Sequence, residues 1–204
     1  MNSFAILIDG GFVKRKLGTA KAPASAKDVQ SLIEKVCVHE MLRGLTLHRV
    51  YFYDAAPLDE QRDKPLQGGR RDFGKEPIVA RSRKLHADLV RVPFVALRMG
   101  ELSFRGWTLK KSDIPTDQPS LTIVSDDLHP LIQQKGVDMR LGLDIAALAL
   151  KRLVQAVVLV TGDSDFVPAM KFARREGLQV FLAPLGHGIY ETMREHSDVV
   201  LEGL

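Results

Sequence analysis

Short apolar runs alternate with amphipathic helical patterns along the whole chain, and this alternation constrains the fold more than any other feature. Units of strand, helix and strand place parallel strands side by side, because the connection between two parallel strands must cross over the sheet. The predicted strands are Phe4 to Ile8, His48 to Ala56, Val92 to Leu109, Ala156 to Asp163, Leu178 to Pro184 and Val199 to Leu201. The predicted helices are Asp28 to Arg43, about Arg71 to Arg91, about Asp138 to Arg152, and one that begins near Ser164. We therefore predict an α/β fold with a mostly parallel central sheet.

The chain is expected to form one domain over residues 1–204, which is long enough to bury a core without disulfides. The strand from Val92 continues into a β-hairpin or extended arm, and the loop-like sequence KKSDIPTDQPS follows it, so we predict an insertion at about 98–125. No apolar run approaches the roughly eighteen residues of a membrane span. The first residues lack the basic segment of a signal peptide, so we expect a cytoplasmic protein. Cys37 is the only cysteine, which excludes a disulfide framework and a thiolate zinc site.

Aspartates follow two of the predicted strands at the point where each strand ends. Asp9 comes directly after the first strand, and Asp163 and Asp165 come after the strand that begins at Ala156. In open α/β sheets the functional crevice lies outside the carboxyl ends of the strands. The helix just upstream of the second strand adds Asp138 and Asp144, which can face the same crevice from the side. The sequence therefore predicts a cluster of carboxylates at one edge of the sheet.

Such carboxylates repel one another unless a cation neutralises them. Mg²⁺ and Mn²⁺ prefer oxygen ligands, and Mg²⁺ takes only a few carboxylates together with waters and a substrate phosphate. The chemistry indicated is phosphodiester hydrolysis, which requires no His, Cys or Ser nucleophile. Asp138 and Asp144 are six residues apart, about 240° around a helix, so both cannot point inward. We expect Asp144 to be a direct ligand and Asp138 to be a helix cap or an outer ligand.

Each acidic residue also has an ordinary structural interpretation. Asp9 precedes two glycines, a position where aspartate commonly caps a helix or turn, and Asp165 could simply be a favourable charge in a first helical turn. Thr161 and Ser164 either contact a phosphate or a carboxylate, or cap the local backbone.

The basic residues suggest a polyanionic partner, since Lys and Arg (29) exceed Asp and Glu (25) and the net charge is +4. The candidate contacts to nucleic acid are Lys135, Arg70, Arg71, Arg105, Trp107 and Lys110. An exposed salt bridge or a solvated helix face would explain the charged residues among them as well. Phe104 and Trp107 lie among basic residues, as in strips that stack single-stranded bases. They could instead form an apolar hairpin edge that docks onto the domain or onto a second subunit, which is compatible with a homodimer.

Three sequence blocks together resemble the NYN domains of the LabA-like group, a branch of the PIN-like nucleases. They are IDGGF, QKGVDMRLGLDIAALAL and VVLVTGDSDFVPAMKFARREG, and the resemblance extends over essentially the whole chain. It implies a three-layer PIN-like α/β/α sandwich and metal-dependent cleavage of RNA. By this resemblance Asp9 matches the acidic residue after the first strand, and Asp163 and Asp165 match the acidic pair of the third block. Asp138 and Asp144 match the two aspartates of the second block.

One position departs from the family pattern, because many NYN domains have Asn shortly after the first Asp and this chain has Gly10-Gly11-Phe12. The leading hypothesis is a metal-dependent endoribonuclease that hydrolyses single-stranded or structured RNA. A second is a non-catalytic RNA-binding or regulatory module of the same fold. A third, a small-molecule phosphatase of the haloacid dehalogenase type, is disfavoured because Gly11 stands where such enzymes need a second Asp.

Overall fold

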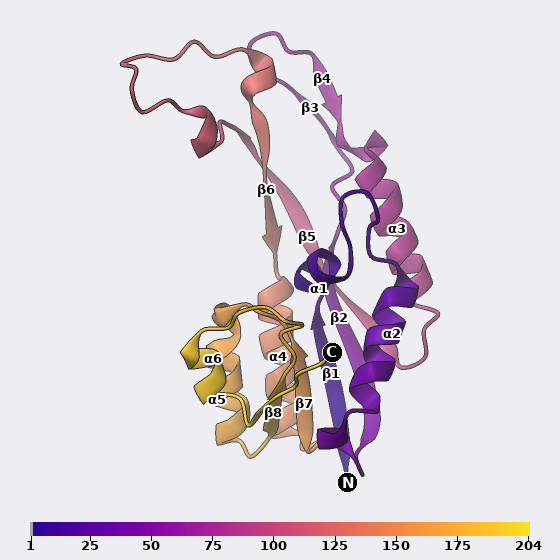
Figure 1. Ribbon diagram of the computed structural model, residues 1–204. Helices are drawn as coiled ribbons and strands as arrows, with labels where there is room; N and C mark the ends of the chain where they lie inside the picture. The colour runs from indigo at the N-terminus through magenta and orange to yellow at the C-terminus, as the bar shows by residue number, and fades with distance from the viewer. Residues whose placement is uncertain (1) are drawn as a thin grey trace.

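A seven-stranded sheet with helices on both faces forms the body of the computed structural model, which describes residues 2–204 (Figure 1). The strand order is β6-β5-β2-β1-β7-β8-β9, and only β5 and β6 are antiparallel. The strands are β1 (Ser3–Asp9), β2 (Thr46–Ala56), β5 (Val95–Thr108), β6 (His129–Lys135), β7 (Ala156–Val160), β8 (Gln179–Leu182) and β9 (Val199–Val200). The predicted α/β class and mostly parallel sheet are confirmed.

The two central strands, β1 and β7, are buried on both faces, as their uninterrupted apolar sequences require. They pair in parallel, with Ile8 opposite Val160, so both strands end at the same level. Their side chains alternate between the two faces, and Leu7 therefore packs in a different core cluster from Ile8. This register brings the residues that follow the two strands to one edge of the sheet.

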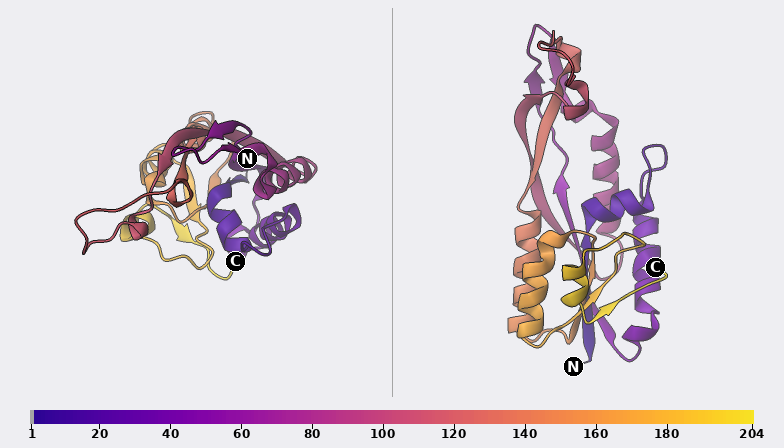
Figure 2. Two further views of the ribbon diagram at one scale, coloured as in Figure 1. Left: turned by 90° about the horizontal axis from the view of Figure 1, so that it is seen from above. Right: turned by 60° about the vertical axis from the view of Figure 1, so that its left-hand side comes forward.

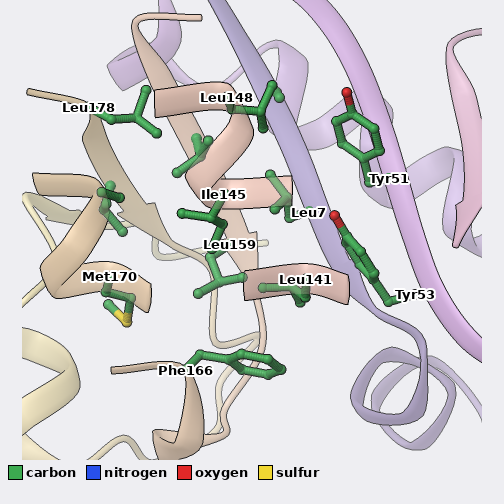
Figure 3. Close-up of a cluster of buried hydrophobic side chains, with 14 of the residues drawn as sticks. Leu7, Tyr51, Tyr53, Leu141, Ile145, Leu148, Leu159, Phe166, Met170 and Leu178 are labelled. Atoms are coloured by element: carbon green, nitrogen blue, oxygen red, sulfur yellow. The ribbon is translucent and has the colours of Figure 1, made fainter. Parts of the chain in front are cut away.

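Three helices cover each face of the sheet, which gives the three-layer sandwich (Figure 2). One face carries α4 (Val137–Leu150), α5 (Val167–Arg175) and α6 (Glu191–Glu195), and the other carries α1 (Gly10–Leu17), α2 (Ala26–Cys37) and α3 (Pro77–Leu89). Leu141, Ile145 and Leu148 of α4 are spaced to face the sheet, where they lie beside Leu7 and Leu159 (Figure 3). Each fully buried side chain of this kind contributes about 1.5–3 kcal/mol of transfer free energy. The core therefore fixes α4 firmly over the central strands.

Two predicted helices are shorter than expected. The helix predicted from Asp28 to Arg43 begins two residues earlier, after the capping box that Ser25 forms with Asp28, and it ends at Cys37. The helix predicted from Arg71 begins only at Pro77, because residues 70–72 form strand β4, which pairs with β3 (Gln61–Asp63). No helix among residues 2–204 combines the length and the apolarity of a membrane span.

An arm extends from the carboxyl edge of the sheet, because β5 continues beyond the last residue that pairs with β2 and then pairs with β6 (Figure 1). The β3–β4 hairpin and Phe73, which follows it, dock against this arm. The Trp107 ring stacks on Phe73 at a centroid distance of 6.2 Å and meets Phe104 edge-on at 5.5 Å, and the Trp107 indole N–H donates to the Asp63 carbonyl at 3.0 Å. Trp107 and Phe104 therefore pack within the domain, as the docking alternative predicted.

Candidate functional site

The carboxylate of Asp9 is fixed by the turn that joins β1 to α1. A side chain at Gly10 could not be accommodated, since a Cβ there would lie 2.5 Å from the Tyr53 carbonyl oxygen. The chain can therefore turn sharply and start α1 at once, and Asp9 Oδ1 accepts a hydrogen bond from the Phe12 N–H at 3.0 Å. Asp9 is thus a helix cap, and its second oxygen remains directed to the neighbouring strand end.

Thr161 joins the acidic residues of the two central strand ends. It is completely buried, and its hydroxyl donates to Asp9 Oδ2 at 3.1 Å. Thr161 Oγ1 also accepts the backbone N–H of Asp163 at 3.1 Å, and Asp163 Oδ1 in turn accepts the N–H of Asp165 at 2.9 Å. One continuous set of hydrogen bonds therefore orders three of the predicted site residues. The Thr161 hydroxyl thus does both things that the sequence allowed: it orients the Asp9 carboxylate and it caps the local backbone at Asp163.

Asp138 faces this group from the first turn of α4. Its pKa is raised above the ordinary value by burial and by the negative charges of Asp9, Asp163 and Asp165. These four aspartates, Asp9, Asp138, Asp163 and Asp165, therefore share one region of negative potential at the carboxyl edge of the sheet, and we call them the acidic group. A bound cation would relieve the repulsion among them.

Asp144 belongs to a different set of contacts. Its Oδ2 accepts hydrogen bonds from the Tyr53 hydroxyl and from Arg98 Nε, both at 2.9 Å. Burial and the adjacent Asp144 carboxylate raise the pKa of Tyr53, so the hydroxyl stays protonated and donates. The structure thus brings Asp138, rather than Asp144, to the group around Asp9, because six residues along α4 turn the second side chain toward β2 and β5. A direct-ligand role for Asp144 remains a prediction, and its contacts favour a positioning role.

Asp54, at the end of β2, is neutralised within the protein. Its side chain is buried, and it contacts Lys14 Nζ at 2.7 and 2.8 Å and His86 Nε2 at 2.9 Å. Burial alone would raise the pKa of Asp54, but the hydrogen bond with His86 and the charge of Lys14 lower it below the ordinary value. Asp54 is therefore committed to an internal ion pair and is not available as a ligand.

The chemistry of the donor set fits a hard divalent cation, because all four side chains of the acidic group offer only oxygen. Within residues 2–204, no three His, Cys, Asp or Glu side chains are gathered closely enough to enclose an ion by themselves. Mg²⁺ commonly takes only one or two carboxylates and keeps several waters. The group thus fits an open site of this type.

The family model of the NYN domain matches residues 98–199, half of the chain, and includes Asp138, Asp163 and Asp165. The chain belongs to the NYN domain family. NYN domains are PIN-like domains that are nuclease-like and act on RNA in general, and assignment to the LabA-like group stays a prediction.

Among solved structures, the NYN domain described here is similar to a crystal structure of a protein of unknown function from Vibrio parahaemolyticus. The TM-score is 0.51 at 15% sequence identity, and the match covers 98% of this chain and 91% of the other. At this identity the likeness shows the fold alone. No curated protein matches the chain.

The predicted RNA-contacting residues of this NYN domain lie mostly on the arm. Arg71 pairs with Glu76 at 2.7 Å and Arg105 donates to Gln133 at 3.1 Å, so both are engaged in local contacts. Arg70 is exposed and lies 4.0 Å from Asp63, and Lys110 and Lys135 are exposed. The arm that carries most of them rises from the same carboxyl edge of the sheet as the acidic group (Figure 1).

The sequence interpretation missed two basic side chains close to the acidic group. His187, in the loop after β8, packs with its ring edge against Phe12 at a centroid distance of 5.8 Å. Arg15 lies in α1, with its guanidinium 3.7 Å from where a Cβ on Gly11 would stand. Neither residue has a fixed sequence spacing to the aspartates. However, His187 follows a predicted strand, and this position alone could have indicated that it lies at the same edge of the sheet as the aspartates.

Proposed function

We propose that this NYN domain is a metal-dependent endoribonuclease that hydrolyses RNA phosphodiester bonds through Mg²⁺ or Mn²⁺ held by aspartates. The observation that carries the proposal is the buried Thr161 hydroxyl, which ties Asp9 to the backbone of Asp163 at the carboxyl edge of the sheet. A hydroxyl in this position orients carboxylates, and such supporting contacts typically govern metal affinity. Family membership supports RNA as the substrate class.

The residues that would hold the cation are Asp9, Asp138, Asp163 and Asp165. When bound, a divalent cation supplies a water of lowered pKa and polarises the phosphoryl oxygen. Thr161 orients the Asp9 carboxylate, and the N–H of Asp165 orients that of Asp163, so these oxygens need little rearrangement on binding. Asp144 is a positioning residue, because its ion pair with Arg98 fixes α4, and with it Asp138, against the sheet.

Single-stranded or structured RNA would lie across the carboxyl edge, with its backbone near exposed cations on either side. Lys135 immediately precedes the turn into α4, whose first helical turn carries Asp138. Lys110 follows β5 on the arm, and Arg70 lies in β4 of the hairpin docked against it. Neutralisation of phosphates by Lys and Arg supplies most of the non-specific affinity for nucleic acid. A cytoplasmic location and a homodimer remain expectations that accompany this proposal.

The test is cleavage of a labelled mixed-sequence RNA with Mn²⁺, with Mg²⁺ or with EDTA. Native protein is compared with Asp163→Asn and with Asp117→Asn, an exposed control in the loop after β5. We expect metal-dependent cleavage by the native and control proteins only. Equal cleavage by all three would identify a contaminant, and RNA binding without cleavage would favour the non-catalytic RNA-binding module.

A further inference from the structure

A cavity of about 370 Å³ lies between the loop after β8 and the last residues of the chain. Its polar lining comes from His187, Arg194 and Glu202, and its apolar lining includes Pro184 and Ile189. This volume lies within the range of small-molecule sites in proteins, which is about 300–1,000 Å³. The cavity is therefore large enough for one nucleotide.

His187 lines the cavity and also packs against Gly162, next to Asp163. A Cβ on Gly162 would stand 2.4 Å from Cδ2 of His187 and 2.8 Å from Cε2 of Phe12, so only glycine permits this packing. Gly162 is the residue directly before Asp163, and the Phe12 N–H caps Asp9. The loop after β8 lies beside α1 (Figures 1 and 2). The imidazole is thus in contact with the segments that carry Asp9 and Asp163, two of the three segments that supply the acidic residues.

The cavity presents the groups that recognise a nucleotide. His187 is exposed and offers a flat ring, and Arg194 is an exposed cation that makes no ion pair with any other side chain of residues 2–204. Glu202 adds a carboxylate that can accept N–H groups from a base edge. Gly186 and Gly188 have no atoms within 4 Å of where a Cβ would stand, so their backbone is open to a ligand.

We propose that this cavity binds the nucleotide adjacent to the scissile phosphodiester of an RNA substrate. The base stacks on the His187 ring, Arg194 contacts the backbone phosphate, and Glu202 accepts an N–H of the base. This inference rests on the proposed nuclease function, because it places the scissile bond at the acidic group. The acidic group offers only carboxylates, which cannot pair with the phosphate of the neighbouring nucleotide or stack on its base. In the cavity, the Arg194 guanidinium can pair with that phosphate and the His187 ring can stack on the base.

The test is binding of a fluorescein-labelled mixed-sequence hexaribonucleotide, followed by anisotropy in EDTA so that cleavage cannot contribute. Loss of one base–aromatic stack weakens binding on the order of tenfold, and we expect this for His187→Ala, whereas His187→Phe keeps the native affinity. For Arg194→Gln, the slope of log K against log salt should become shallower by about 0.7, the value for one phosphate of a single strand. Arg91→Gln, an exposed arginine at the end of α3, is the matched control and should leave the slope unchanged.

Cleavage in Mn²⁺ and thermal unfolding are measured on the same preparations. If the native protein binds RNA and does not cleave it, while His187→Ala and Arg194→Gln weaken binding, the nuclease proposal fails and the nucleotide site stands. If the native protein cleaves RNA and these stably folded variants bind like the native protein, the nucleotide site is overturned and the nuclease stands. Absence of measurable hexanucleotide binding by the native protein would also overturn the nucleotide site.

Discussion

Replacing Thr161 by Val tests whether the hydroxyl between the two central strand ends organises the acidic group. Valine has nearly the same shape, so the change removes the hydroxyl and leaves no cavity at this completely buried position. Two hydrogen bonds of 3.1 Å are lost, one to Asp9 and one from the N–H of Asp163. At about 1 kcal/mol for each bond, the free energy of unfolding should fall by about 2 kcal/mol. In a chain of this size that lowers Tm by about 4–8 °C.

The effect on activity should exceed the effect on stability at temperatures where the variant is folded. Contacts that orient metal ligands are typically worth 10–100-fold in metal affinity or activity. We therefore expect Thr161→Val to raise the Mn²⁺ concentration for half-maximal RNA cleavage by at least tenfold, measured well below Tm. Thr161→Ser keeps the hydroxyl and should restore most of the native metal dependence. A Val variant with native metal dependence would refute the reasoning.

Three further predictions concern the residues around the site. Asp54 has a folded pKa below its unfolded value of about 3.9, so its contribution to stability is complete above that pH and is lost as pH falls through the folded pKa. Thermal unfolding between pH 6 and pH 2 should show a steeper acid-side loss of Tm for the native protein than for Asp54→Asn. Asp144→Asn should lower the free energy of unfolding by roughly 1–2 kcal/mol. It should impair RNA cleavage less than Asp138→Asn does, and the reverse order of cleavage rates would make Asp144 the metal ligand. Trp107→Ala should loosen the arm, so limited proteolysis within 109–124 should become faster at unchanged stability of the core, and an unchanged proteolysis rate would contradict the docking role of this ring.

The central strands and the acidic residues that follow them could be predicted from sequence, because both depend on local patterns. A continuous apolar run such as Phe4 to Ile8 can be buried only between two layers, and its end marks the carboxyl edge. Helix periodicity also indicated that Asp138 and Asp144 point in different directions. Which of them faces the crevice depends on Tyr53 and Arg98, which come from two distant strands. Spacing alone could not decide between them.

Elements that depend on pairing between distant segments were missed or misplaced. Strand β6 is an exposed edge strand, and it exists because β5 pairs with it. Residues 71–76 were assigned to a helix, although Pro77 at the start of α3 is a recognisable N-terminal signal. Helix α1 was not predicted, since Gly10 and Gly11 are poor helix formers, and its start depends on the Asp9 cap and on burial of Phe12.

The measurement that tests the central claim most directly is the rate of RNA cleavage as Mn²⁺ is titrated into the native protein and into Asp163→Asn, with Asp117→Asn as the control. We predict saturable, EDTA-sensitive cleavage by the native and Asp117→Asn proteins and a loss of at least a hundredfold in Asp163→Asn, on the order of the 10²–10³-fold cost of removing one electrostatic catalytic group. Thermal unfolding should show that all three proteins are folded. Cleavage that persists in EDTA, or that is equal in native and Asp163→Asn proteins, would contradict an aspartate-held metal site.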